Sequence, residues 1–238
     1  MKTIRIFAVL ATLVFLSSNS RALFAAEEEG VALGIVYDTS GSMKEQVRDG
    51  SGGMTSKYVI ANRALQEIAK RIQAFAANAP ATGPRKIHAG LFVFEGNGAR
   101  QAIPFGVFKA AAFDSWARSF SAPNGGTPLG TAVSAASRAV LNSNLTRKHV
   151  LVITDGISNV GPAPPAVIPG LKRQAEQKQT ALSIHFVAFD VDAKVFDGVK
   201  KLGATVVCAA NETQLNEQLS FILEKKILLE EEEPPKKK

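Results

Sequence analysis

The chain of 238 residues is long enough to bury the core of one large domain, and its 46% hydrophobic and 21% charged residues are typical of a globular protein. It carries 28 Lys and Arg against 21 Asp and Glu. Three of these basic residues (Lys2, Arg5 and Arg21) lie in the N-terminal segment, and without them the balance is 25 against 21, or +4. The remaining basic residues are scattered and not interleaved with aromatic ones, which argues against nucleic-acid binding.

The N-terminal segment has the layout of a secretory signal peptide. Lys2 and Arg5 precede an apolar stretch from residue 6 to 16, and small or polar residues follow up to residue 26. This stretch is shorter than the roughly 20 apolar residues of a membrane span. We therefore expect residues 1–26 to be cleaved, no stable membrane span in the mature chain, and a periplasmic or secreted protein.

Strand and helix patterns alternate along the rest of the chain. The first apolar run, "GVALGIVYD", predicts a buried strand, and apolar residues at helical spacing predict a helix from Lys57 to Phe75. Pro104 restricts the run around it to an edge of the sheet. The further expected strands are 86–96, 102–108, 149–156, 181–190 and 205–210, and the further expected helices are 113–120, 129–141, 167–178 and 212–229.

This order predicts an α/β fold. We expect a Rossmann-like, doubly wound and mainly parallel six-stranded sheet with one antiparallel edge strand and helices on both faces. Ligands of such sheets bind at the carboxyl ends of the strands. Following the chain up and down places four loops at that edge, namely "DTSGSM", "GNGARQ", "GGTPLG" and "TDGISN".

Three of these loops carry acid or hydroxyl groups suited to a hard cation. Asp38, Ser40 and Ser42 follow the first strand at alternate positions, Thr127 lies in a glycine-rich loop, and Asp155 ends the fourth strand. Together they offer five oxygen-bearing side chains, with no nitrogen or sulfur ligand. Such a set suits a divalent cation, Mg²⁺ first and Mn²⁺ or Ca²⁺ as alternatives, rather than zinc.

The same three segments carry a resemblance. The order D-T-S-G-S-M, G-G-T-P-L and I-T-D-G, from about Val31 to Leu229, is similar to the von Willebrand factor type A (VWA) domain and its metal-ion-dependent adhesion site (MIDAS). The resemblance implies a VWA domain over residues 27–229, without enzymatic turnover. It implies direct metal binding by Ser40, Ser42 and, in the ligand-engaged form, Thr127. Asp38 and Asp155 would act through water, and a partner protein would supply a carboxylate.

Two other readings remain. One is a metal-independent VWA scaffold for assembly of an envelope complex, and the other, less favoured, is a metal-dependent phosphohydrolase using the aspartate after the first strand. Enzymes that transfer phosphoryl groups in this way usually have a second carboxylate two residues after the first, where this chain has Ser40. No catalytic serine elbow, phosphate loop or dinucleotide fingerprint is present in the sequence. Replacing Asp38 by alanine would separate cation-dependent binding from the scaffold.

Several smaller features complete the expectations. Residues 44–56 are either a specificity loop or a solvated insertion, and the proline-rich 161–170 segment is expected to shape a partner surface. Cys208, the one cysteine, lies in an apolar run and is expected to be a buried, inert thiol. The histidines His88, His149 and His185 lack metal-ligand spacing, so we expect hydrogen-bonded side chains. The charged tail 230–238 is expected to be solvated.

Overall fold

The computed structural model describes residues 27–78 and 85–229. The predicted signal peptide (1–26) and tail (230–238) lie outside the described residues. Within the described ranges, no helix is both long enough and apolar enough to cross a bilayer.

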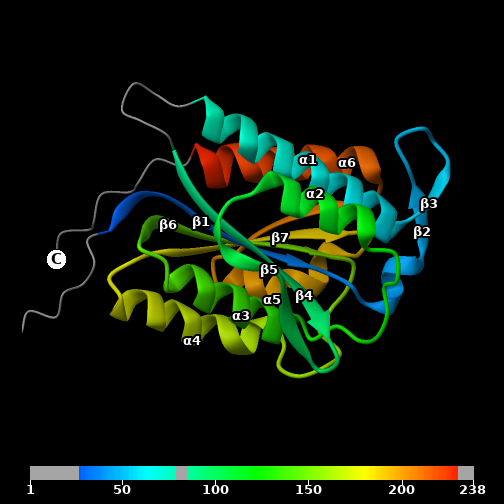
Figure 1. Ribbon diagram of the computed structural model, residues 1–238. Coiled ribbons are helices and arrows are strands. Elements are labelled where there is room, and N and C mark those ends of the chain that lie inside the picture. The colour runs from blue at the N-terminus through cyan, green and yellow to red at the C-terminus, as the bar shows by residue number, and fades with distance from the viewer. Residues whose placement is uncertain (1–26, 79–84, 230–238) are drawn as a thin grey trace, which may run out of the picture.

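A six-stranded sheet forms the centre of the molecule, in the order β5-β4-β1-β6-β7-β8 (Figure 1). Strands β1, β4, β6, β7 and β8 run parallel, and β5 pairs antiparallel with β4 at one edge. The predicted fold class is confirmed, including the edge position of the strand that contains Pro104. The bounds are β1 Glu28–Tyr37, β4 Lys86–Glu95, β5 Gly98–Val107, β6 Leu145–Thr154, β7 Leu182–Phe189 and β8 Thr205–Ala209.

Helices cover both faces of the sheet, as Figure 1 shows from the side. One face packs against α1 (Lys57–Ala77), α2 (Ala110–Ser119), α6 (Glu212–Ile222) and the π-helix η3 (Leu223–Leu228). The other face packs against α3 (Leu129–Leu141), α4 (Pro164–Gln177), the 3₁₀ helix η2 (Ala193–Phe196) and α5 (Asp197–Lys201). Strand β1 is buried on both faces from Gly30 onward, because helices lie above and below it.

Glycine allows one of these helices to approach the sheet closely. Gly34 lies in the middle of β1, and a Cβ atom added there would be 3.0 Å from the Cβ of Ala136 on α3. The absent side chain lets α3 lie directly against the central strand. This packing holds α3, which follows the loop that carries Thr127, against the middle of β1.

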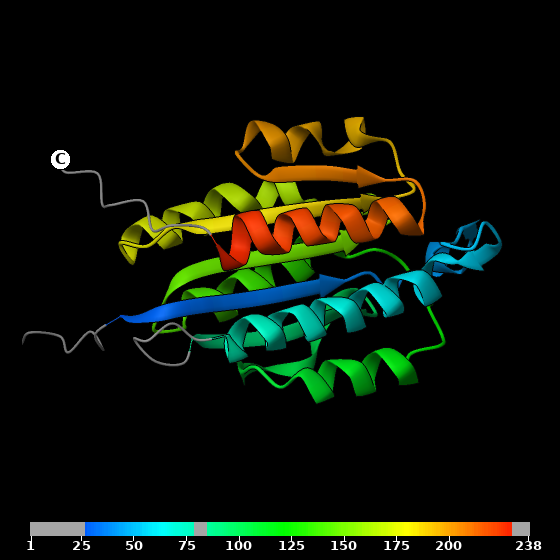
Figure 2. The same cartoon turned by 90° about the horizontal axis from the view of Figure 1, so that it is seen from above.

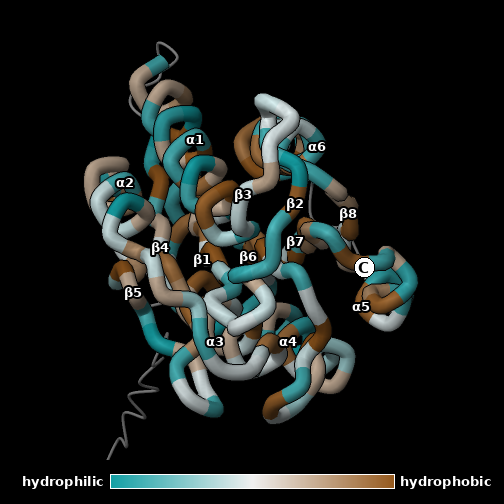
Figure 3. The backbone as a smooth tube through the Cα atoms, turned by 90° about the vertical axis from the view of Figure 1, so that its right-hand side faces the viewer, coloured by the Kyte–Doolittle hydropathy of each residue, from teal (hydrophilic) through white to brown (hydrophobic). Residues whose placement is uncertain are grey.

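The parallel strands all end at the same side of the molecule, where their arrowheads lie in Figure 2. Figure 3 looks at this side directly. The turn after β1, the 3₁₀ helix η1 (Gly41–Lys44), the loop before α3 and the segment after β6 all lie here. The sheet therefore brings together the segments in which the sequence placed candidate metal ligands.

The 44–56 segment and the proline-rich segment both contain regular secondary structure. Residues 44–56 contain a two-stranded antiparallel hairpin, β2 (Gln46–Arg48) and β3 (Met54–Ser56), which projects beside the strand ends (Figure 1). The proline-rich segment is largely helical, because α4 begins at Pro164 and continues through Pro169. Proline is well suited to the first turn of a helix, where the missing N–H has no partner to lose.

The expectation for Cys208 is wrong, because its side chain is exposed. The residue lies on β8, which is the edge strand opposite β5 and is only partly covered. An apolar sequence run predicts burial when a strand lies inside the sheet, but β8 has a neighbour on one side only. The exposure therefore follows from strand order, which the local sequence does not contain.

Candidate metal site

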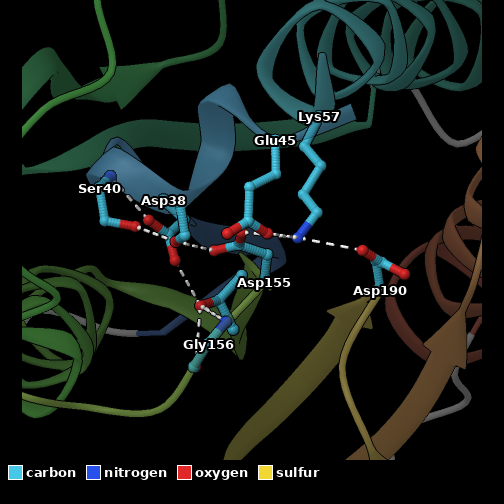
Figure 4. A network of polar contacts seen from close by, with 9 residues as sticks. Asp38, Ser40, Glu45, Lys57, Asp155, Gly156 and Asp190 are labelled. Carbon is cyan, nitrogen blue, oxygen red and sulfur yellow. Dashed lines mark hydrogen bonds and ion pairs between the residues drawn. The ribbon is translucent and has the colours of Figure 1, made fainter. Parts of the chain in front are cut away.

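The first part of the site is the turn that follows β1. The backbone N–H of Asp38 donates to the carbonyl of Ile153 on β6 (3.0 Å), which anchors the turn to the neighbouring strand. The carboxylate then turns back, since its Oδ1 accepts from the N–H of Ser40 (2.8 Å). This contact closes the turn and directs Ser40 to the same side as Asp38, as the close view shows (Figure 4).

A chain of short contacts connects two hydroxyls to a carboxylate. The Oγ atoms of Ser40 and Ser42 lie 3.1 Å apart, and Ser42 donates to Oδ1 of Asp155 at 2.8 Å. Asp155 directly follows β6, and its side chain is fully buried. Residues 113 positions apart in sequence thus meet, because β1 and β6 are adjacent parallel strands that end together.

The loop that carries Thr127 is attached to both of these segments. Asn124 donates its N–H to the carbonyl of Thr39 (2.8 Å), and Gly41 donates to the carbonyl of Gly125 (3.1 Å). Gly125 has a φ of +81°, a conformation that glycine adopts without strain. On the other side, the N–H of Thr127 donates to Oδ1 of Asn159 (2.7 Å). Thr127 is therefore held between the turn after β1 and the segment after β6.

The structure thus places all five sequence-predicted residues at one edge of the sheet. It also shows partners that the sequence analysis did not single out. Thr154, the last residue of β6, donates its hydroxyl to Oδ2 of Asp38 (2.5 Å). Asn159 holds the backbone of Thr127. The sequence could have indicated Thr154, because it lies next to Asp155 in the motif "ITDG". No local sequence pattern indicates Asn159.

Burial changes the protonation of the central aspartate. The pKa of Asp38 is raised to about 6, first because the carboxylate is desolvated and second because Asp155 carries a like charge nearby. The hydrogen bonds from Ser40 and Thr154 oppose this shift. The buried carboxylates of Asp38 and Asp155 repel each other when both are ionised, and a cation bound between them would reduce this repulsion.

Lys57, the first residue of α1, adds a buried ammonium group beside these residues. Its Nζ lies 3.2 Å from Oδ2 of Asp155, 2.8 Å from Glu45 and 3.1 Å from Asp190, as Figure 4 shows. Burial by itself lowers the pKa of Lys57, but the three carboxylates outweigh it and raise the pKa above its ordinary value. The sequence analysis missed this residue, because a single lysine at a helix start carries no distinctive pattern.

The oxygen groups fit a small divalent cation. Neighbouring oxygens on an octahedral Mg²⁺, at about 2.0–2.1 Å from the metal, are about 2.9 Å apart. The Oγ atoms of Ser40 and Ser42, 3.1 Å apart, are close to this spacing, and the 2.8 Å hydrogen bond from Ser42 to Asp155 suits a carboxylate that holds a ligand without being one. In the described part of the chain no group of three or more His, Cys, Asp or Glu side chains forms a metal cluster. The site therefore depends on hydroxyl oxygens, which suit hard cations better than zinc.

Two further clusters lie apart from these oxygens. His149 and His185 are buried on β6 and β7, with Nδ1 of the first 3.3 Å from Nε2 of the second. Burial lowers the pKa of both, to about 3 for His149, with the neighbouring charges of His185 and Arg147 adding to the shift, and to about 4 for His185, with that of Lys226. Separately, a cavity of about 360 Å³ lies at the ends of β7 and β8, lined by residues that include Asp190, Asp192, Cys208 and Gln214.

The fold and the oxygen cluster define a class of protein. The sequence matches the family model of the von Willebrand factor type A domain over residues 33–219. The chain therefore belongs to the VWA domain family. No curated protein matches it in sequence.

Several solved structures share the fold at low sequence identity. The PilB minor pilin of Streptococcus sanguinis superposes with a TM-score of 0.60 and 14% identity, covering 83% of this chain and 62% of the pilin. The vWF domain of the type V pili tip protein Mfa5 from Porphyromonas gingivalis gives 0.59 and 15%, covering 87% and 99%. Proximal thread matrix protein 1 from the mussel byssus, with a zinc-occupied MIDAS motif, gives 0.58 and 15%.

This chain spans only part of the length of two of these proteins. This chain is 83% covered by the mussel protein but spans only 48% of it, and it spans 62% of the pilin. At these identities the likeness concerns the fold.

Proposed function

We propose that this VWA domain binds a partner protein through a divalent cation held at the carboxyl edge of its sheet. Ser40, Ser42 and Thr127 would coordinate the ion directly, with Thr127 joining when the ligand is engaged, and Asp38 and Asp155 would act through water. Mg²⁺ is the expected ion. The observation that carries this proposal is the chain of oxygens from Ser40 through Ser42 to Asp155, at 3.1 and 2.8 Å.

The donor set favours binding over turnover. Because the two aspartates would act through water, the direct ligands would be neutral hydroxyls and water, and the divalent ion would retain positive charge and an open position, which an acidic side chain of a partner would fill. Beside the ion, Lys57 is already ion-paired with three carboxylates and is therefore not available as a base. A protein-binding role, without an enzymatic reaction, is therefore our proposal.

We further propose that the protein is exported. The signal-like segment at residues 1–26, with basic residues before an apolar stretch and small residues after it, supports this. The pilin and pilus-tip domains that share the fold are consistent with a location outside the cytoplasm.

The test is capture of partners from the native source with the immobilised protein. Capture in Mg²⁺ is compared with capture in EDTA, for the wild type, Asp38→Ala and Ser42→Ala. Ser220→Ala, which removes a hydroxyl bonded only within α6, is the matched control. We expect partners that require Mg²⁺, are lost in both site variants and are retained by the control. Recovery of the same partners under all conditions would contradict the metal bridge and support the metal-independent scaffold.

A further inference from the structure

A buried lysine contacts Asp155 of the metal site from the side opposite the serines. The side chain of Lys57 is 3% exposed, and its ammonium reaches three carboxylates from three separate segments. Glu45 follows η1, Asp155 follows β6 and Asp190 follows β7 (Figure 4). The lysine therefore connects the turn beside the serines, the centre of the site and the wall of the neighbouring 360 Å³ cavity, to which Asp190 belongs.

Asp155 is shared between the lysine and the serines. Its Oδ1 accepts from Ser42, and its Oδ2 lies 3.2 Å from the Lys57 ammonium. A divalent cation bound near Ser40 and Ser42 would therefore share the charge of this carboxylate with a second, permanent cation. Because Asp155 is buried, water screens the two positive charges from each other only weakly.

The position of Lys57 has no local explanation. It is the first residue of α1, where the partial positive charge of the helix dipole disfavours a cation. Burying an ammonium group costs several kcal/mol unless partners compensate it. Both costs are offset by the three carboxylates that contact the ammonium group. The electrostatics of the site therefore explain why a lysine is buried at this position, and the helix does not.

We propose that Lys57 is a built-in cation of the metal site. It lowers the affinity of the site for a divalent ion and reduces the negative charge of the site. The proposal rests on the metal-binding function proposed above. The carboxylates of Asp38, Glu45, Asp155 and Asp190 carry four negative charges when ionised. With a divalent ion and Lys57 these groups together have a net charge of −1, and without Lys57 it would be −2. An acidic partner group therefore meets less repulsion because the lysine is present.

The direct test is the affinity for Mn²⁺ alone, measured by isothermal titration calorimetry on the full chain. Lys57→Met removes the charge and keeps most of the side-chain volume, and we expect its Kd to be roughly tenfold lower than that of the wild type. Lys57→Arg keeps the charge and should retain the wild-type Kd. The matched control is Lys148→Met, because Lys148 is equally buried and pairs with Glu27 near the start of β6. Its Kd should not change.

A second comparison covers the case in which Lys57→Met alone does not fold. Glu45 is 67% exposed, so Glu45→Gln should fold, and the double variant Glu45→Gln/Lys57→Met leaves fewer uncompensated carboxylates. We expect the double variant to bind Mn²⁺ roughly tenfold more tightly than Glu45→Gln alone. An equal or weaker affinity in this comparison, or in Lys57→Met against the wild type, overturns the proposal, because Lys57 would then only position Asp155.

The failure of this inference is distinguishable from the failure of the proposed function. If the wild type does not bind Mn²⁺, or if Ser42→Ala binds it equally well, the metal site is wrong and the role of Lys57 falls with it. If Mn²⁺ binds and Ser42→Ala loses it while Lys57→Met has the wild-type Kd, only the role of Lys57 is wrong.

Discussion

Ser42 donates its hydroxyl to Oδ1 of Asp155 over 2.8 Å, although 113 residues separate the two in sequence. The contact exists because β1 and β6 pair in parallel and end at the same edge. Ser42 follows one strand and Asp155 follows the other, so a single pairing brings a hydroxyl and a buried carboxylate together.

A bound divalent cation should stabilise the folded chain. A ligand that binds only the folded state, at 100 times its Kd, adds about 2.7 kcal/mol. For a domain of this size that corresponds to a rise in Tm of about 5 °C or more. Differential scanning fluorimetry with Mg²⁺ or Mn²⁺, against EDTA, measures the shift. Ser42→Ala should lose it and Ser220→Ala should keep it. A shift of equal size in both variants would place the ion elsewhere.

Asp38→Asn should stabilise the metal-free protein while removing metal binding. The pKa of Asp38 is raised to about 6, so the folded protein retains this proton when the unfolded chain has lost it. The contribution of Asp38 to stability in EDTA therefore falls as the pH rises from about 4 to about 6, and the loss persists at pH 7. Replacing the carboxylate should recover about 1–3 kcal/mol at pH 7.

Urea unfolding in EDTA at pH 7 checks this expectation for Asp38, with Ser220→Ala as the neutral control. A less stable Asp38→Asn variant would mean that the hydrogen bonds from Ser40 and Thr154 contribute more than the burial of the charge costs.

The buried histidine pair should make the protein sensitive to mild acid. Above about pH 6.5 both histidines are neutral in the folded and unfolded states, so they do not affect stability there. Below that pH the unfolded chain binds protons that the folded chain excludes, because the pKa values of His149 and His185 are lowered to about 3 and 4. The contribution of the two histidines to stability should therefore fall by roughly 3 kcal/mol or more between pH 6.5 and 4, opposite in sign to the contribution of Asp38 over the same range.

Urea unfolding at pH 7.5, 6 and 5 measures the acid sensitivity. His185→Gln should reduce the slope of stability against pH, and His88→Gln, at a partly exposed position, should not. Equal slopes in the wild type and His185→Gln would remove the histidine pair as the cause.

Cys208 should react in the native state. Its side chain is exposed on edge strand β8 and lines the cavity at the ends of β7 and β8. A thiol reagent such as DTNB should modify it without denaturant, at a rate within about tenfold of that in the unfolded chain. Cys208→Ala is the blank. Modification only after denaturation would contradict the exposure.

Gly130→Ala should destabilise the loop arrangement around the site. A Cβ atom added at Gly130 would be 2.1 Å from the carbonyl oxygen of Pro162, so α3 or the segment before α4 must move. Overpacking of this kind costs about 1–3 kcal/mol, and the movement should also weaken Mg²⁺ binding. Gly170→Ala on α4, where the nearest atom is the end of the flexible Arg173 side chain at 3.8 Å, is the control.

The Gly170→Ala control should not destabilise the protein. Alanine favours a helix interior over glycine by about 1 kcal/mol, so Gly170→Ala should be neutral or stabilising. Thermal unfolding of both variants decides the matter, and a stable Gly130→Ala would show that the loop yields at little cost.

The sequence by itself determined the order of elements and the oxygen residues of the site. Apolar runs bounded by turns predict buried strands, and helical spacing predicts the helices between them, because both patterns repeat over short distances. Asp38, Ser40, Ser42, Thr127 and Asp155 lie just past strands or before a helix, so alternation alone places them at one edge. Pro104 predicts the edge strand for the same local reason, since proline removes a ladder hydrogen bond.

Only the tertiary structure decided which charges meet and which side chains are covered. Lys57 reaches Asp155 and Asp190 because three segments converge, and no local pattern marks a lysine at a helix start as part of a site. Cys208 is exposed because β8 has a neighbour on one side only, although its apolar run is typical of burial. Periodicity is set by neighbouring residues along the chain, whereas burial and electrostatic interaction depend on distances in space that strand order fixes.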